Sequence, residues 1–241
     1  MSEHIVKSFD EELQELAAGI AEMGGLAERL VDDAVTALAR NNAELAQEVI
    51  RTDIRLDQMQ RDLEEKAIIM LARRQPMALD LRQAVAVLRI SGDLERVGDL
   101  AKNIAKRALA IDGQFNSKSL THGVEHIAEL AMTQLKAVLD AYAARDIAAS
   151  AQIRDRDQEV DALYTSLFRE LLTYMMEDPR NISQCTHLLF CAKNIERIGD
   201  HATNIAETIH YLVTGQQLSD ERVKDDLTST TSLDFDPAAN D

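Results

Sequence analysis

The sequence predicts an all-α protein built as two tandem three-helix bundles from an internal duplication. Its 241 residues include only three Pro, nine Gly and no Trp, a composition that favours long helices over sheet. Apolar residues recur at steps of three and four, which is the period of an amphipathic helix. The stretch Glu95–Asp99 (E-R-V-G-D) returns 101 residues later as Glu196–Asp200 (E-R-I-G-D), and both copies lead to an Asn-Ile pair. A ten-residue pattern that recurs in this way indicates a duplicated unit.

The first unit is expected to contain three helices of about 30 residues each. An apolar seam from Phe9 to Ala34 predicts the first helix, which ends at the Asn41-Asn42 break. Pro76 and an Asp-Gly pair then end two further helices, expected at about residues 43–73 and 78–111.

The second unit repeats this plan, with Pro179 as the counterpart of Pro76 and Gly215 as the expected C-cap of the last helix. Its helices are expected at about residues 122–144, 147–176 and 182–214. The two bundles therefore occupy residues 1–115 and 120–216, joined by a short polar linker. From Leu218 on, seven acidic residues stand against two basic ones, so we expect residues 217–241 to form a disordered acidic tail.

The net charge limits the kinds of molecule that the protein can bind, and the hydropathy pattern limits where in the cell it is expected. A formal net charge of −16 argues against binding to a nucleic-acid backbone, which demands clustered Lys and Arg. The N-terminus has no apolar signal core, and no apolar run approaches the ~20 residues that span a bilayer. We therefore expect a soluble, cytoplasmic protein. Cys185 and Cys191 stand six residues apart, and we expect them to be packing residues in a reducing compartment.

Each copy of the repeated pattern carries two carboxylates and an amide at spacings of four. On a helix these residues form one line of oxygen atoms. A single such line is also explained as a solvated face whose acids pair with Arg96 or Lys102. An exposed salt bridge contributes only ~0–1 kcal/mol, so the recurrence of the whole set favours a functional role. The residues are Glu95, Asp99 and Asn103 in the first copy and Glu196, Asp200 and Asn204 in the second.

An aspartate interrupts the apolar seam of the middle helix in both units. Asp53 and Asp157 hold matching seam positions, and Asp57 and Asp161 follow them by four. A buried carboxylate needs a base, a proton or a metal ion. If this helix faces the E-x-x-x-D helix of its unit, four carboxylates converge, and such a donor set suits hard cations. The alternative is a buried ion pair with a base nearby in sequence: Arg51, Arg55, Arg154 or Arg156.

Signals for catalysis are few. A ferritin-like di-iron helix would place His three residues after each motif glutamate, but Gly98 and Gly199 stand there. The chain has no H-E-x-x-H, no Cys/His zinc spacing and no phosphate-binding glycine loop. His201 is expected on a helix surface. We therefore expect no enzymatic activity; the alternative is a carboxylate-bridged, metal-dependent hydrolase or oxidase.

The duplicated E-R-x-G-D motif, the R-R-Q-P turn at residues 73–76, the stretch Tyr174–Asp178 and the chain length together resemble the PhoU family of bacterial phosphate-signalling regulators. The resemblance covers roughly Phe9 to Gly215. It implies a commonly dimeric tandem bundle that is not an enzyme and that represses the phosphate-starvation response when phosphate is plentiful. The implied partners are the ATPase of the high-affinity phosphate ABC transporter and a membrane-bound sensor histidine kinase, so contact with the membrane is indirect.

The resemblance also implies metal binding, because some family members hold iron, zinc or other metal ions through E/D-x-x-x-D motifs. Those motifs map onto Glu95 with Asp99 and onto Glu196 with Asp200. The facing positions Asp53, Asp57, Asp157 and Asp161 are assigned as ligands from helical register alone. Asn103 and Asn204 are possible additional ligands.

Overall fold

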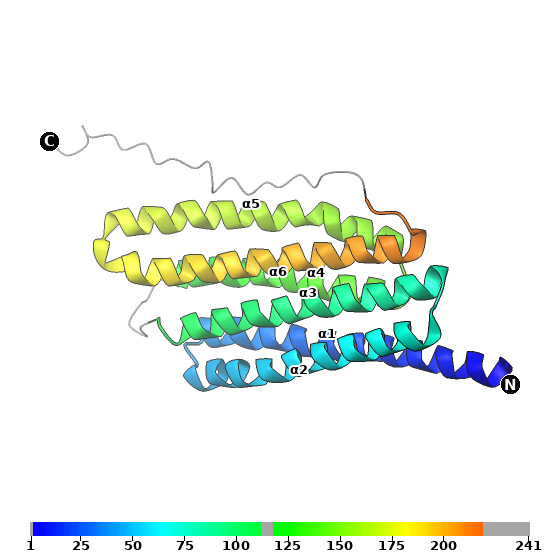
Figure 1. Ribbon diagram of the computed structural model, residues 1–241. Coiled ribbons are helices and arrows are strands. Elements are labelled where there is room, and N and C mark those ends of the chain that lie inside the picture. The colour runs from blue at the N-terminus through cyan, green and yellow to red at the C-terminus, as the bar shows by residue number, and fades with distance from the viewer. Residues whose placement is uncertain (1, 112–117, 219–241) are drawn as a thin grey trace.

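The computed structural model describes residues 2–111 and 118–218, and these residues form six long helices (Figure 1). No strand occurs in these two ranges, so the prediction of an all-α chain is confirmed. The elements are α1 (Ser2–Ala39), α2 (Ala43–Arg74), α3 (Ala78–Ala108), α4 (Lys118–Ala144), α5 (Ile147–Glu177), a 3₁₀ turn η1 (Pro179–Asn181) and α6 (Ile182–Thr214). None of the helices in these ranges is long and apolar enough to cross a membrane.

Helix boundaries differ from the predicted ones at three places. α1 begins at Ser2, seven residues before the start of the predicted seam at Phe9. α3 ends at Ala108 rather than near residue 111, because its last turn tightens and the Ala110 N–H donates to Arg107 O at 2.9 Å. α4 begins at Lys118 rather than near residue 122, since the buried Leu120 continues the apolar seam by one turn. Most of the predicted linker (residues 112–117) and the predicted tail from residue 219 on lie outside the described residues.

Local hydrogen bonds begin and end the helices where the sequence indicates. Asn42 Oδ1 accepts from the Leu45 N–H at 3.1 Å at the start of α2, and Asp146 Oδ1 accepts from the Ala149 N–H at 3.0 Å at the start of α5. Both are side-chain caps of otherwise unpaired helix donors. Gly215 takes a left-handed φ of 75° just after α6, which glycine adopts without strain.

The two repeats share one core. Within each repeat the three helices contact one another, and in addition α3 packs along α6 and α1 along α4. α3 and α6 lie centrally in Figure 1, between α2 on one side and α5 on the other. The buried apolar residues of all six helices form a single continuous cluster, so each repeat completes the burial of the other.

α3 and α6 run antiparallel. Near the start of α3, Arg82 Nε donates to Leu212 O, close to the end of α6, at 3.0 Å. Near the end of α3, the Arg107 guanidinium lies 4.0 Å from the ring centroid of Phe190, in the first half of α6, a cation–π contact. The repeated motifs on these two helices therefore run in opposite directions.

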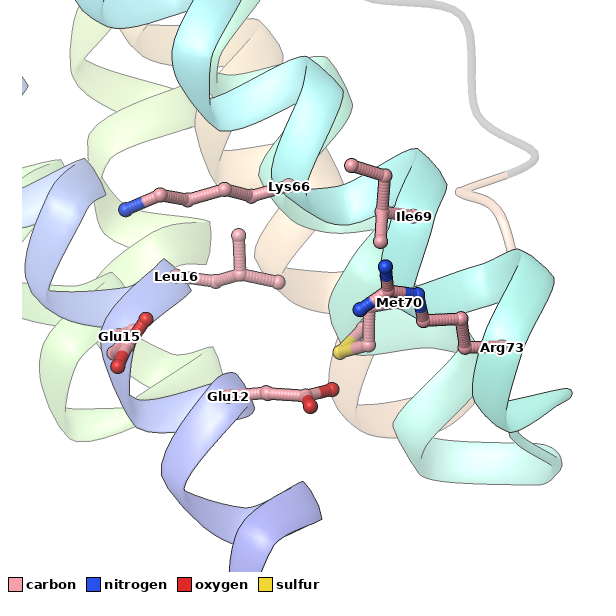
Figure 2. A pocket seen from close by; sticks show the side chains of 7 residues that line it. All are labelled: Glu12, Glu15, Leu16, Lys66, Ile69, Met70 and Arg73. Carbon is pink, nitrogen blue, oxygen red and sulfur yellow. The ribbon is translucent and has the colours of Figure 1, made fainter.

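α1 and α2 line an open pocket of about 180 Å³ (Figure 2). Arg74 pairs with Glu12 at 2.6 Å and joins α1 to the end of α2 in the same region. Apolar and charged side chains both line the pocket, and none of them is a predicted ligand: Glu12, Glu15, Leu16, Lys66, Ile69, Met70 and Arg73.

The glycine of the repeated motif allows the middle helix of each repeat to approach the last one closely. A Cβ at Gly98 would overlap Leu56 Cδ2 and lie 3.2 Å from Asp53 Oδ1. A Cβ at Gly199 would lie 3.2 Å from Asp157 Oδ1. Because glycine has no side chain, each seam aspartate lies directly against the helix that carries the E-x-x-G-D sequence.

Gly98→Ala is expected to be less stable than Gly92→Ala by about 1–3 kcal/mol, because its methyl group overpacks a buried contact. Gly92 lies on the same helix, and a Cβ there meets no atom within 4 Å. That variant should gain the roughly 0.5–1 kcal/mol by which Ala exceeds Gly in a helix. Urea unfolding followed by circular dichroism measures both. Equal stability of the two variants would show that α2 does not need the space at Gly98.

Candidate functional site

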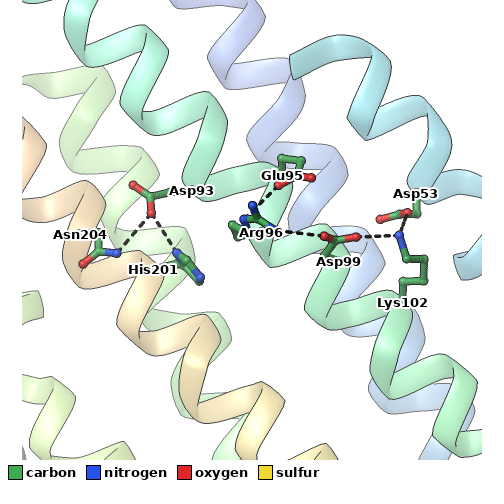
Figure 3. Close-up of polar contacts among 8 residues, drawn as sticks. All are labelled: Asp53, Asp93, Glu95, Arg96, Asp99, Lys102, His201 and Asn204. Atoms are coloured by element: carbon green, nitrogen blue, oxygen red, sulfur yellow. Dashed lines mark hydrogen bonds and ion pairs between the residues drawn. The ribbon is translucent and has the colours of Figure 1, made fainter. Parts of the chain in front are cut away.

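The acids of the first repeat converge between α2 and α3, as the register predicts (Figure 3). Asp53 is buried on α2 (2% exposed), while Glu95 and Asp99 are half-buried on α3. Burial raises the pKa of Glu95, and the negative charges of Asp99, Asp57 and Asp53 raise it further against the opposing effect of Arg96. We call Asp53, Asp57, Glu95 and Asp99 the first acidic cluster.

Lys102 supplies a positive charge inside the first acidic cluster. Its Nζ donates to Asp53 Oδ2 at 2.5 Å and to Asp99 Oδ1 at 2.6 Å, so it bridges α2 and α3. Burial lowers the pKa of Lys102, but the hydrogen bonds to the two carboxylates outweigh it and hold the pKa above its usual value. The ammonium group is therefore a fixed countercharge.

The arginines named from the sequence as partners of Asp53 bind elsewhere. Arg51 pairs with Glu48 at 2.7 Å, and Arg55 pairs with Glu22 at 3.0 Å. Lys102, named from the sequence only as a partner of the exposed line, is the base that reaches Asp53. In the second repeat, Arg154 lies 3.7 Å from Glu207 and Arg156 lies 3.7 Å from Glu159.

The acids of the second repeat converge between α5 and α6 and are more deeply buried. Asp157, Asp161 and Glu196 are buried, and Asp200 is half-buried. Burial raises the pKa of Glu196 to about 7; Lys193 opposes this shift, and the charges of Asp200 and Asp161 add to it. The Lys193 Nζ lies 3.0 Å from Glu196 Oε2. We call Asp157, Asp161, Glu196 and Asp200 the second acidic cluster.

A glutamine from α4 borders the second acidic cluster. Gln134 is buried, and its Oε1 has no hydrogen-bond partner among the described residues. This oxygen and Asp157 Oδ1 lie 3.1 and 3.2 Å from the Cβ position at Gly199. Gln134 is not among the residues predicted from the sequence; the available signal was a polar residue at a seam position, three residues after Ala131.

Asn103, Asn204 and His201 lie outside the two acidic clusters in three different settings. Asn103 is exposed on α3, and Asn204 Nδ2 donates to Asp93 Oδ1, in the other repeat, at 3.3 Å (Figure 3). His201 Nδ1 lies 2.9 Å from the same Asp93 oxygen, and its side chain is only 16% exposed. The prediction of a helix-surface histidine is therefore wrong, because the α3–α6 packing covers that face of α6.

A lysine lies among the carboxylates of both clusters. Within residues 2–111 and 118–218, no three or more His, Cys, Asp or Glu side chains are arranged to hold one. In the first acidic cluster a cation would have to displace the Lys102 ammonium from Asp53 and Asp99. In the second acidic cluster the Lys193 ammonium already lies 3.0 Å from Glu196, and burial, more than the charges of Asp200 and Asp161, raises the pKa of that carboxyl group. Metal binding itself stays a prediction.

The chain matches the PhoU domain family model over residues 20–108 and 124–209, one match in each repeat. It is 62% identical over 227 residues to the "Phosphate-specific transport system accessory protein PhoU homolog" of Rhizobium meliloti, covering 94% of this chain and 96% of that protein. The homolog of Caulobacter vibrioides (strain NA1000 / CB15N) is 53% identical over 229 residues, covering 95% and 100%.

Solved structures share the fold. The crystal structure of PhoU from Pseudomonas aeruginosa matches with a TM-score of 0.83 and 40% identity, over 86% of this chain and 100% of that chain. The phosphate transport system regulatory protein PhoU from Streptococcus pneumoniae matches with a TM-score of 0.81 and 28% identity, over 88% and 99%.

Glu196→Gln is expected to stabilise the protein at pH 8 and to do so much less at pH 5. Below pH 4.5 the carboxyl group is protonated in both the folded and the unfolded state. Between pH 4.5 and about 7 the unfolded state loses its proton first, so the wild type loses stability as pH rises. A shift of this size corresponds to roughly 3 kcal/mol; because the variant also loses the Lys193 pair, we expect a gain of about 1–3 kcal/mol.

Urea unfolding in EDTA at pH 5 and pH 8 measures this difference without interference from cations. Glu65→Gln, which removes one carboxylate charge at an exposed position of α2, serves as the matched control. A gain at Glu196 that is equal at the two pH values would contradict the raised pKa.

Proposed function

The chain belongs to the PhoU family, and from this premise we propose that it is a negative regulator of the phosphate-starvation response. Its relatives are accessory proteins of the phosphate-specific transport system, which supports a role in phosphate regulation. The finer proposal is a cytoplasmic adaptor that links the ATPase of a high-affinity phosphate ABC transporter to a sensor histidine kinase. The observation that carries it is the 62% identity over 94% of the chain, which spans both repeats.

An adaptor needs exposed surface for protein partners, and large apolar side chains are exposed around both interhelical turns. The α2–α3 and α5–α6 turns lie at opposite ends of the bundle (Figure 1), so the two ends could meet different partners. Such side chains, when grouped, mark protein-binding surfaces. They are Ile68, Ile69, Met77, Leu79 and Leu81 around the first turn, with Met77 81% exposed, and Met176, Ile182 and Phe190 around the second.

Deletion of the gene is expected to make alkaline-phosphatase-type starvation genes constitutive in high phosphate, because the kinase would lose its repressing input. Expression of the wild-type chain should restore repression. Ile68→Asp/Met77→Asp should fail to restore it at equal protein level, since two buried charges would weaken a protein contact by roughly 2 kcal/mol or more. Ile54→Asp, also at an exposed isoleucine of α2, is the matched control.

A reporter-gene assay in high phosphate measures all four strains. Normal repression in the deletion strain would overturn the adaptor proposal. Full repression by the double variant would leave the adaptor role standing and remove the α2–α3 turn from its binding surface.

We further propose that the chain binds iron or another divalent cation through its acidic lines, and that it forms a homodimer. A bound cation would hold two helices together and add stability in proportion to ln(1 + [L]/Kd). Elemental analysis of native-purified protein should find metal that is absent from a variant with Glu95, Asp99, Glu196 and Asp200 changed to Ala. Light scattering after size exclusion measures the oligomeric state. No observation on the described residues favours the hydrolase or oxidase alternative.

A further inference from the structure

We propose that the start of the acidic tail, through Asp220 and Glu221, binds back on the protein itself in an open groove between α3 and α6. The two carboxylates pair there with Arg89 and Arg96. This contact covers part of the junction between the two repeats with a segment of the same chain. The inference goes beyond the proposed adaptor role and the proposed metal binding, and it depends on neither. It revises the expected disorder of the tail for its first residues alone.

The groove runs along the face on which α3 packs against α6, and its volume is about 580 Å³. Arg89 and Arg96 line it from α3, and Asn204 and Tyr211 line it from α6. The two arginines are seven residues apart in the sequence, so they share one face of α3. Their separation along the helix axis is about 10 Å. An elongated acidic segment can therefore pair with both.

Both arginines are available to an acidic ligand. Within residues 2–111 and 118–218, Arg89 forms no ion pair, and its guanidinium lies 5.0 Å from the ring centroid of Tyr211. Arg96 is exposed, and its nitrogens lie 3.5 Å from Glu95 and 3.6 Å from Asp99, which is longer than a strong hydrogen bond. A two-point contact between an arginine and a carboxylate is shorter and stronger than these contacts. Each arginine can therefore still gain a close acidic partner.

The carboxylates that line the groove already have partners. Asp93 Oδ1 lies 2.9 Å from His201 Nδ1 and accepts from Asn204 Nδ2 at 3.3 Å (Figure 3). Glu207 Oε1 lies 3.7 Å from Arg154 Nε. These contacts offset part of the negative charge in the groove, so the two arginines of α3 favour an anionic ligand there.

The chain itself enters the groove. After Gly215 it turns back along α6, because the Gln216 carbonyl oxygen lies 3.1 Å from His210 Nδ1; a carbonyl oxygen only accepts, so the histidine donates this hydrogen bond. Gln217 and Leu218 then line the groove. Leu218 also lines a smaller hollow of about 70 Å³ between α5 and α6. The acidic tail therefore starts at the groove rather than at the end of the bundle.

The acids that follow lie within reach of both arginines. Ser219, Asp220 and Glu221 come directly after Leu218. An extended chain spans at most about 3.3–3.6 Å per residue, so the two acids reach roughly 7–11 Å beyond Leu218, a distance comparable to the spacing of the arginines. Beyond residue 218 the sequence has seven acidic residues against two basic ones. Most of the surface of a protein with a net charge of −16 repels such a segment, whereas the arginines of the groove attract it.

Limited digestion of the full chain with trypsin tests the contact, because Arg222 and Lys224 follow the two acids. Docking of the tail slows cleavage at both of these positions. We expect Arg89→Gln/Arg96→Gln to speed the cleavage roughly 3- to 30-fold, since the docked state then loses two exposed ion pairs. Mass spectrometry assigns each cleavage position and measures its rate.

Arg51→Gln/Arg55→Gln is the matched control, because it removes two exposed arginines from α2, and it should be cleaved like the wild type. Equal cleavage of the wild type and Arg89→Gln/Arg96→Gln would overturn the proposal; this is the result for a tail that lies over α5 or stays free in solution. Equally faster cleavage of the control would show a general effect of charge and would overturn it too.

Exchange of the charges provides a second test, which does not depend on proteolysis. Arg89→Glu/Arg96→Glu should release the segment, and the addition of Asp220→Lys/Glu221→Lys should restore the contact with the charges reversed. The steady-state ¹H–¹⁵N NOE of the amides of residues 219–224 in the full chain measures this. It should be high in the wild type, low in the double variant and high again in the quadruple variant. Low values in the wild type, or no recovery in the quadruple variant, would contradict the proposal.

Discussion

The close approach of the middle helix to the last helix in each repeat governs the chemistry of this protein. At Gly98 and Gly199 the absence of a side chain lets a seam aspartate reach the facing helix. That aspartate is buried, and a buried carboxylate requires a countercharge, a proton or a metal ion. The glycine therefore leaves each repeat with a buried negative charge, whose cost in free energy other residues must offset. The glycine of the E-R-x-G-D motif is thus explained by the close packing of two helices, whether or not the carboxylates of the motif bind a metal ion.

The two repeats solve this problem with different residues on the same backbone plan. The first repeat inserts Lys102 between the aspartate of one helix and that of the other. In the second repeat Lys193 lies 3.0 Å from Glu196, and the deeper burial of this glutamate raises its pKa to about 7. A fold that looks symmetric at the level of its helices is thus asymmetric in its electrostatics. This electrostatic difference comes from a few substitutions between the repeats. They leave the helical pattern of apolar residues unchanged, so both repeats keep the same fold.

The sequence predicts the helices well because helical period, proline breaks and caps are local signals. It also predicts that the two acidic lines of each repeat face each other, since that follows from register on two helices. It does not predict which base reaches Asp53, because Lys102 lies 49 residues away and its reach depends on the angle at which α2 and α3 cross. The same dependence on packing explains the error at His201, which α3 covers, and the omission of Gln134, which comes from a third helix.

The shared core of the two repeats has a consequence for how such a chain could originate. A lone repeat would expose the face of α3 that here packs on α6, and it could bury that face against a second copy of itself. In such a pair the two acidic clusters would be identical by symmetry, each with the same residue at the position of Lys102. Joining the copies in one chain removes that requirement. A single chain can therefore carry Lys102 in one half and Thr203 in the other, a difference that two identical chains cannot have.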